Sequence, residues 1–233
     1  MRPGFDSLHP DTSTRFTRSV QAFRLTSFAQ CKHNKMSKLL IATTNPSKLQ
    51  EAVSILGGNF EVLSLKDFEN IKSVEETGKT FEENAVLKAK GYFAQTGVPC
   101  VADDGGLIVD YLGGAPGVSS HRWLGRQATD QELAEAIIEK MAGVPFHQRK
   151  ARIGGFLVFW DGRNLLKKEN WTEGYISERL QGEVRPGFPY RPVMVVAQFD
   201  KPYAFLTSEE HEKVNARRKN LKELIREIKR LGY

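Results

Sequence analysis

The chain has 233 residues, of which 40% are hydrophobic and 27% are charged, so it can bury a core and is not expected to be disordered throughout. It contains no run of about eighteen apolar residues, so we expect a soluble protein without a membrane-spanning helix. The formal net charge is +6, and the two cysteines, Cys31 and Cys100, lie in no metal-binding or redox spacing, which excludes a disulfide framework and favours a reducing compartment, the cytoplasm.

Positive charge is concentrated at the N-terminus. Residues 1–35 carry six Lys or Arg against two Asp, which is +4 and leaves +2 for the rest, so nucleic acid is not the expected partner. This segment is rich in Ser, Thr and Arg and has no helical or strand period, so we predict a basic extension, disordered or not native, before a domain over residues 36–233. It is either an organellar transit peptide or upstream sequence that precedes a true start at Met36.

The first half of the domain alternates strands and helices. Apolar runs predict strands over residues 38–43, 60–64 and 99–103. A helix is predicted over 46–56, with Asn45 as its N-cap and Pro46 at its first position. A second helix starts with a capping box made by Thr80 and Glu83.

The second half starts with a breaker, Gly-Gly-Ala-Pro-Gly at 113–117. A helix is predicted over 130–141, a β-hairpin over 151–180 that turns at Asp161-Gly162, and a strand near 193–199. One long helix is predicted over 209–230, with its apolar face formed by Val214, Leu221, Leu224, Ile225, Ile228 and Leu231. This order of elements indicates a mixed α/β fold.

A cluster of polar residues follows the first predicted strand. The N-terminus of a helix presents free N–H groups and the positive end of the helix dipole, which together bind anions. Thr43, Asn45 and Lys48 add a hydroxyl, an amide and an ammonium there, which would suit a phosphate chain. The alternative is that Asn45 only caps the helix and Lys48 is solvated.

Two further clusters carry carboxylates. Asp103 and Asp104 leave a buried strand and meet two glycines, and adjacent carboxylates there need a cation such as Mg²⁺, unless they form a surface turn. Glu76 in the loop before the second helix could complete the magnesium site, and Lys88 inside that helix could reach a phosphate. Together the clusters point to phosphoryl or nucleotidyl hydrolysis, because no Walker loop or Gly-x-Gly-x-x-Gly fingerprint competes with them.

Four stretches, "TTNPSKLQEA", "EETGKTFEENAVLKAK", "ADDGGLIVDYLGGAPGVSSHR" and "GFPYRP", fall in the order seen in the inosine triphosphate pyrophosphatases, the house-cleaning enzymes that remove deaminated purine nucleotides. The chain resembles this family over roughly residues 37–231. The resemblance implies an elongated, twisted mixed sheet with helices on both sides, two lobes with a central cleft, and a homodimer. It also implies Mg²⁺-dependent hydrolysis, with Mn²⁺ as the other candidate metal, of a nucleoside triphosphate to a monophosphate and pyrophosphate.

The resemblance also assigns roles to residues by position. Phosphates would be bound by Thr43, Asn45, Lys48, Lys88 and, on weaker grounds, Arg122. The metal would be held by Glu76, Asp103 and Asp104, with Asp104 also serving as the general base. The base would be bound by Phe188, Tyr190, Arg191, His211 and Arg217, although Phe188 and Tyr190 could instead be core aromatics.

The base-binding half departs from the family pattern. The usual Phe-Gly-Tyr-Asp-Pro is here Phe-Pro-Tyr-Arg-Pro, so Arg191 stands in place of an acid. His211 replaces a lysine, Ala216 replaces a histidine, and Gly105 replaces the serine after the Asp pair. Since base discrimination depends on buried polar groups that find their partners, these changes should alter selectivity more than hydrolysis.

The expected function is therefore hydrolysis of inosine, xanthosine or deoxyinosine triphosphate in nucleotide-pool cleaning. A pyrophosphatase with altered base specificity and a non-catalytic nucleotide sensor are the alternatives. An RNA-binding module would need basic residues and exposed aromatics interleaved on the domain, and the basic excess lies instead in residues 1–35.

Overall fold

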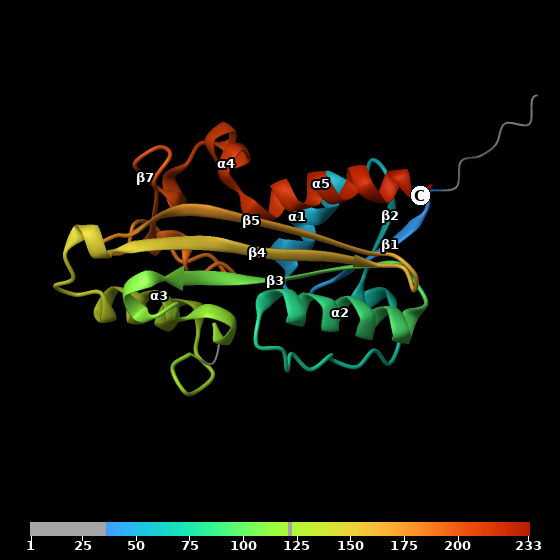
Figure 1. Cartoon of the computed structure of the whole chain (residues 1–233), viewed down its shortest axis with the longest axis horizontal. Helices are drawn as coiled ribbons and strands as arrows, with labels where there is room; N and C mark the ends of the chain where they lie inside the picture. Colours follow the sequence, from blue (N-terminus) through green and yellow to red (C-terminus); the bar gives the residue numbers. More distant parts are fainter. Residues whose placement is uncertain (1–35, 121–122) are drawn as a thin grey trace, which may run out of the picture. The chain divides into compact units, whose positions relative to one another are not determined.

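The computed structural model describes residues 36–120 and 123–233, and Met36–Tyr233 form one compact unit. The predictions made for residues 1–35 and for Arg122 lie outside the described residues. Within the described part, seven strands form one mixed sheet in the order β2-β1-β3-β4-β5-β6-β7 (Figure 1). The strands are β1 (Lys38–Ala42), β2 (Glu61–Ser64), β3 (Cys100–Val109), β4 (Lys150–Trp160), β5 (Leu165–Ile176), β6 (Met194–Val196) and β7 (Lys201–Pro202). The predicted mixed α/β fold is confirmed.

The first two helices begin where their capping residues predicted. Helix α1 (Pro46–Leu56) follows β1, and the Asn45 side chain accepts hydrogen bonds from the backbone N–H groups of Ser47 and Lys48. Helix α2 (Phe81–Thr96) starts with the predicted capping box and ends at Gly97, which has a left-handed φ of 66°. Since β1 pairs in parallel with both β2 and β3, these helices are the crossover connections of the sheet.

Strand β3 is longer than predicted. It does not end at the Asp103-Asp104 pair but continues to Val109, antiparallel to β4. The glycines that follow the pair lie opposite Gly154 and Gly155, and a Cβ at Gly105 would come within 2.2 Å of the Gly154 carbonyl oxygen. The glycines therefore allow two backbones to approach closely inside the sheet, and the alternative of a surface turn is wrong.

The predicted hairpin is confirmed as β4 and β5. Its turn contains Gly162 with a φ of 94°, and Asp161 Oδ1 accepts from the N–H groups of Arg163 at 2.8 Å and Asn164 at 2.6 Å. The strand expected near 193–199 is confined to β6, and β7 follows it as a short antiparallel partner.

Helices cover both faces of the sheet (Figure 1). Helices α1 and α5 (Ala216–Arg230) pack on one face, around Phe159 of β4, and α2 packs on the other, around Val158. Consecutive strand residues face opposite layers, which explains why two neighbours belong to different clusters. A third cluster lies where β3, β5 and β6 meet α3 (Asp130–Lys140).

The predicted final helix is divided in two, α4 (Ser208–Val214) and α5. Asn215 between them has an extended conformation, with φ −62° and ψ 106°, and its side chain accepts from the N–H of Arg218. The helical spacing of apolar residues continues across Asn215, and this is why the sequence pattern predicted one helix. Val214 belongs to the cluster under α3 and Leu231 is 40% exposed, so the predicted single apolar face was wrong at both ends.

Short 3₁₀ helices occupy several connections, at Leu65–Asp67, Asp110–Leu112, Gly117–Ser119, Phe146–Gln148, Arg191–Val193 and Tyr203–Phe205. Among the described residues, no helix has both the length and the apolar character needed to span a membrane.

Candidate active site

A cleft of about 420 Å³ lies where β1 ends beside β3. The two strands are parallel, with Ala42 opposite Ala102, so Thr43 and Asp103 come next at the same edge of the sheet. Because β1 stops there and β3 continues, that edge of β3 is left open to the cleft. The lining gathers eleven of the predicted site residues: Thr43, Asn45, Lys48, Glu76, Lys88, Asp103, Asp104, Phe188, Tyr190, Arg191 and Arg217.

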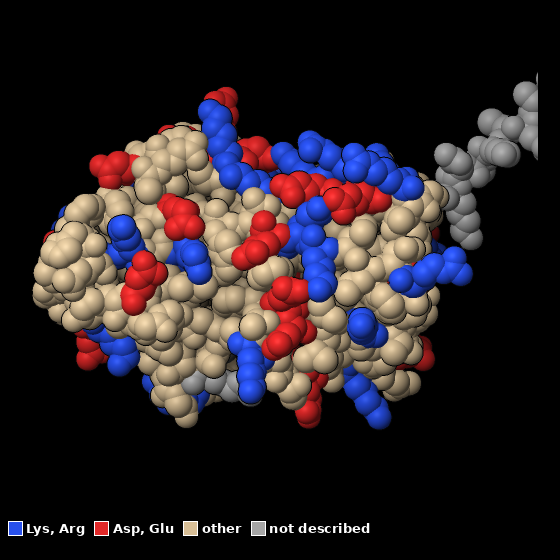
Figure 2. All heavy atoms as spheres, in the orientation of Figure 1, with Lys and Arg blue, Asp and Glu red and all other residues tan. Residues whose placement is uncertain are grey.

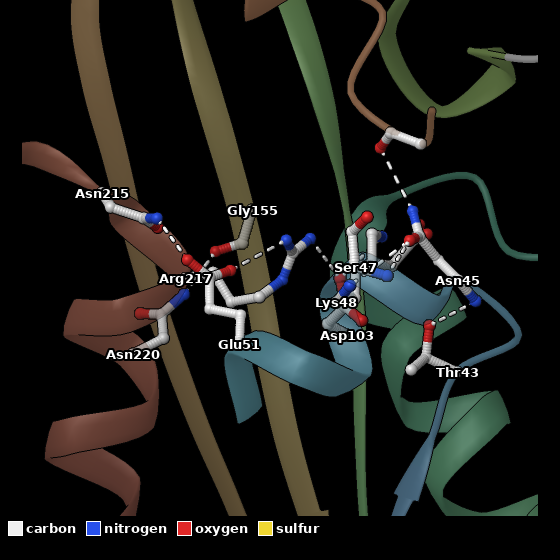
Figure 3. Close-up of polar contacts among 12 residues, drawn as sticks. Thr43, Asn45, Ser47, Lys48, Glu51, Asp103, Gly155, Asn215, Arg217 and Asn220 are labelled. Carbon is white, nitrogen blue, oxygen red and sulfur yellow. Dashed lines mark hydrogen bonds and ion pairs between the residues drawn. The ribbon is translucent and has the colours of Figure 1, made fainter. Parts of the chain in front are cut away.

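Asp103 lies between two cations on one face of the sheet (Figure 3). Its Oδ2 accepts from Lys48 Nζ at 2.8 Å and from Arg217 Nη2 at 2.7 Å, so α1 and α5 both reach it. Burial alone would raise the pKa of Asp103, but the two cations hold it well below its ordinary value. The carboxylate is therefore ionised, and a basic pair surrounds it.

Asp104 faces the opposite layer, as the next residue in a strand must. Its Oδ1 accepts from Lys88 Nζ of α2 at 3.0 Å, and the same ammonium donates to Glu76 Oε2 at 3.0 Å. Burial raises the pKa of Asp104 to about 6; Lys88 opposes this rise, while Glu76 and Asp103 add to it. A carboxylate whose pKa lies near neutrality is suited to accept a proton from water.

The polar cluster after β1 performs the capping role in this structure. Asn45 Oδ1 accepts from the N–H of Ser47 at 2.9 Å and of Lys48 at 3.3 Å, and Thr43 Oγ1 accepts from the N–H of Asn45 at 3.2 Å. Phosphate binding by these residues stays a prediction, and their place in the cleft is compatible with it.

The segment that carries Phe188 is held against this cap. Asn45 Nδ2 donates to the carbonyl oxygen of Gly187 at 3.1 Å, and the N–H of Gly187 donates to Asp130 Oδ2 at 2.5 Å. Gly187 has a φ of 79°, and a Cβ there would come within 2.1 Å of Asn45 Nδ2. Only glycine fits this position, and it joins the predicted phosphate side of the cleft to the predicted base side.

The predicted base-binding residues have different environments. Phe188 is partly exposed, and the guanidinium carbon of Arg191 lies 3.7 Å from its ring centroid. Tyr190 is only 4% exposed, packs in the cluster under α3 and donates through its hydroxyl to the Ser120 carbonyl at 3.3 Å. The ring of Tyr190 is thus a core aromatic, while Phe188 keeps a surface for stacking.

His211 lies outside the residues that line the cleft. Its ring packs edge-on against Tyr203, a lining residue, with a centroid distance of 5.3 Å. Burial lowers the pKa of His211 to about 4, and Arg191 lowers it further, while Glu51 opposes them. The imidazole thus lies behind Tyr203, outside the lining of the cleft, and base binding by His211 stays a prediction.

We expect this histidine to make stability depend on pH. The pKa is about 4 in the folded state against an ordinary 6.5, so the unfolded chain binds more protons and stability falls as pH drops from 6.5 to 4. Urea unfolding at pH 7 and at pH 4.5 measures this loss. In His211→Gln, the loss of unfolding free energy between pH 7 and pH 4.5 should be smaller than in the wild type by roughly 1–3 kcal/mol. The matched change at exposed His147, His147→Gln, should leave it unaltered, and equal losses in all three proteins would contradict the assignment.

Sequence reasoning missed three polar residues near Arg217, which are Glu51, Asn215 and Asn220 (Figure 3). Glu51 Oε2 lies 3.5 Å from Arg217 Nη1, and Glu51 Oε1 accepts from Asn215 Nδ2 at 2.5 Å. Asn220 is fully buried and donates to the Gly155 carbonyl at 2.9 Å, which ties α5 to β4. One signal was present, since Glu51 follows Lys48 at i+3 and so shares its helix face.

A divalent cation fits two of the three predicted metal ligands. Asp104 and Glu76 converge on one ammonium, and Asp104 Oδ2 is buried without a hydrogen-bond partner among the described residues. Residues 36–120 and 123–233 contain no group of three or more His, Cys, Asp or Glu placed to hold a metal ion, and Asp103 is instead bound by two cations. Mg²⁺ is commonly held by one or two carboxylates with substrate phosphates, which this pair could provide.

Comparison with known proteins gives consistent matches. The Ham1 family matches residues 39–227. The chain is 42% identical over 199 residues to a dITP/XTP pyrophosphatase of Photobacterium profundum, covering 83% of this chain and 99% of that one. It is 40% identical over 191 residues to the dITP/XTP pyrophosphatase of Bacillus subtilis, covering 81% and 96%.

Solved structures agree with these matches. A HAM1 protein from Coxiella burnetii has a TM-score of 0.74 at 30% identity, covering 84% of this chain and all of that one (100%). A nucleoside-triphosphatase / dITP/XTP pyrophosphatase from Mycobacterium abscessus has a TM-score of 0.66 at 34% identity, covering 80% and 98%.

Proposed function

Because this chain belongs to the Ham1 family, we propose that it is a nucleoside triphosphate pyrophosphatase that hydrolyses inosine, xanthosine and deoxyinosine triphosphates to the monophosphate and pyrophosphate. Such an enzyme removes deaminated purine nucleotides from the pool. The curated relatives that carry the name dITP/XTP pyrophosphatase support this substrate class.

The observation that carries the proposal is the pair of adjacent carboxylates in the cleft. Asp104 has a pKa of about 6 and lies 3.0 Å from Lys88, whereas Asp103 is held ionised by Lys48 and Arg217. One residue is thus suited to proton transfer, while its neighbour fixes two cations beside it. A site that only bound nucleotide would have little need of a water-activating acid.

The proposed reaction uses these residues in three roles. Lys48 and Lys88 neutralise the charge of the triphosphate, and Asp104 takes a proton from water as its oxygen attacks the α-phosphorus. The bond from the α-phosphorus to the oxygen bridging it to the β-phosphate breaks, and pyrophosphate leaves with that oxygen. Phe188 offers a ring face on which the base can stack.

We further propose that Glu76 and Asp104 hold Mg²⁺, with Mn²⁺ as the other candidate. When bound, the ion would polarise the phosphate oxygens and offset their negative charge. We also propose that the protein is a homodimer in the cytoplasm, or in an organelle if residues 1–35 are a transit peptide. The proposal of a homodimer is based only on the resemblance to the family.

A panel of substrates tests the proposed function. Pyrophosphate release would be measured from inosine, deoxyinosine and xanthosine triphosphates and from the four common ribonucleoside triphosphates, with Mg²⁺ and with excess chelator. We expect release from the first three to exceed the common four by about tenfold or more in kcat/KM and to require the metal.

Two other outcomes of this assay would contradict the proposed reaction. No release from any triphosphate would overturn the proposed function, and measurable binding in that case would favour a nucleotide sensor. Release of orthophosphate in place of pyrophosphate would show that the attack is at a different phosphorus.

A further inference from the structure

Arg191 is a cation without a polar partner in the described part of the chain. It lines the cleft and is partly buried, yet no hydrogen bond or ion pair joins its guanidinium to any described residue. Its neighbours are aromatic, with Phe188 at 3.7 Å and Tyr203 at 5.3 Å from the guanidinium carbon. Burial lowers the pKa of Arg191 from its ordinary value, but a guanidinium stays charged at neutral pH.

The charges around Arg191 do not balance it. Glu51 is the acid that acts on it, and that carboxylate already accepts from Asn215 and pairs with Arg217. The other charged neighbours, Arg217 and Arg185, are cations that also lower its pKa.

The same wall contains a second unsatisfied donor. Arg217 Nε is buried without a hydrogen-bond partner among the described residues, and Ala216 beside it contributes no polar side-chain atom. This part of the cleft therefore carries spare donors and positive charge, with aromatic faces next to them. Acceptors and negative charge in a ligand would satisfy these donors, and the aromatic faces favour a flat ring that carries them.

We propose that Arg191 selects the base, and that it favours a base whose edge carries acceptors and negative charge: xanthine first, hypoxanthine second, and adenine last. This rests on the proposed function, because it names the preferred member of that substrate class. Xanthine has two keto oxygens and a ring imide acidic enough to be largely ionised near neutral pH. Hypoxanthine offers one keto oxygen and is neutral, and the amino group of adenine would present a donor to donors.

The energetic reason is that a charge-assisted hydrogen bond is about twice as strong as a neutral one. A guanidinium can also bind two acceptors on one base edge at once, as it does with the keto oxygen and ring nitrogen of guanine in DNA. A partly buried guanidinium without a partner carries the cost of its lost hydration. A base that offers acceptors relieves this cost, and a base that offers a donor does not.

The test compares kcat/KM for xanthosine and inosine triphosphates in four proteins. Arg191→Gln removes the charge but keeps a donor, and Arg191→Lys keeps the charge but loses the planar fork. Arg185→Gln is the matched control, because it removes a charge from an exposed neighbour that does not line the cleft. We expect Arg191→Gln to lower the xanthosine-to-inosine ratio by about 10- to 100-fold, Arg191→Lys to lower it less, and Arg185→Gln to leave it within about twofold.

Two further readouts separate base selection from a structural role. The preference of the wild type for xanthosine should decline as pH falls and the base becomes neutral, whereas that of Arg191→Gln should be flat. Calorimetric titration of xanthosine and inosine monophosphates without metal should show the same ratio change, without needing turnover.

Failure of base selection by Arg191 can be distinguished from failure of the proposed function. If the wild type releases no pyrophosphate, the proposed function fails, and the monophosphate titration still tests Arg191. If the wild type is active but the ratio is unchanged in Arg191→Gln, the selection by Arg191 is wrong and the function stands. An equal change of the ratio in Arg185→Gln would also overturn the proposal. The effect would then come from the overall positive potential near the cleft and not from contact between Arg191 and the base.

Discussion

Asp104→Asn is expected to lower kcat for pyrophosphate release by about 10²- to 10⁴-fold while substrate binding stays measurable. Asparagine has nearly the same shape and can still accept from Lys88, but it cannot take a proton from water. The pKa of Asp104 is raised to about 6, which makes it the carboxylate best suited to accept a proton among the described residues of the cleft. The substitution removes this carboxylate.

The control for Asp104→Asn is Asp110→Asn, which makes the same chemical change just after the end of the same strand, at an exposed residue. It should leave kcat unchanged within about twofold. Thermal unfolding of both variants would show whether either has lost its fold. A folded Asp104→Asn protein that releases pyrophosphate at the wild-type rate would remove the assignment of Asp104 as the general base.

Arg149→Met is expected to lower the free energy of unfolding by about 3–5 kcal/mol. Arg149 is 4% exposed, and among the described residues its guanidinium donates to four backbone carbonyls and to no carboxylate. The acceptors are Ile176 at 2.7 Å, Met141 at 2.8 Å, Val144 at 3.1 Å and Ser177 at 2.6 Å. Methionine fills similar space but leaves these buried oxygens without a donor.

Urea unfolding measures this change, with Arg163→Met at the exposed β4–β5 turn as the matched control. Arg163→Met should change the free energy of unfolding by less than about 0.5 kcal/mol. Because Arg149 does not line the cleft, kcat at a temperature where the variant is folded should stay close to the wild-type value. A loss below about 1 kcal/mol in Arg149→Met would mean that water replaces the guanidinium at these carbonyls.

Local chemistry allowed much of the fold to be predicted. Asn45 and the Thr80–Glu83 pair marked helix starts because a cap depends on neighbours a few residues away. The Asp161-Gly162 turn marked the hairpin for the same reason. The site clusters between residues 43 and 104 were recognisable because their polar residues follow predicted strands or lie before or within the second predicted helix, and the parallel pairing of β1 and β3 is what brings them together.

Features that depend on distant partners were not predictable in this way. The end of β3 was misplaced because the glycines after Asp104 are explained only by Gly154 and Gly155, about fifty residues later in the chain. The break at Asn215 was missed because the apolar period continues through it, although asparagine is a common N-cap. The role of Arg149 depends on four carbonyls that no local pattern marks.

Surface charge adds little to the case for a nucleic-acid partner. Figure 2 shows Lys and Arg gathered along the upper edge, over α5, with a row of Asp and Glu directly beneath them. Cations of α5 and of the neighbouring strand β5 form ion pairs, as Arg218 does with Glu212 and Lys168 does with Glu227. On this face the basic residues are thus interleaved with acids.

The alternation of Asp103 and Asp104 across β3 has a consequence for how such proteins can diverge. Each carboxylate is assigned to its layer of helices by parity, that is, by being an odd or even residue along the strand. One inserted or deleted residue between Cys100 and Asp103 would turn Asp103 toward the layer of Lys88 and Asp104 toward the layer of Lys48 and Arg217, and would move each carboxylate one residue along the strand. Loops on either side of β3 can therefore change length during evolution, whereas the strand can change only by substitution.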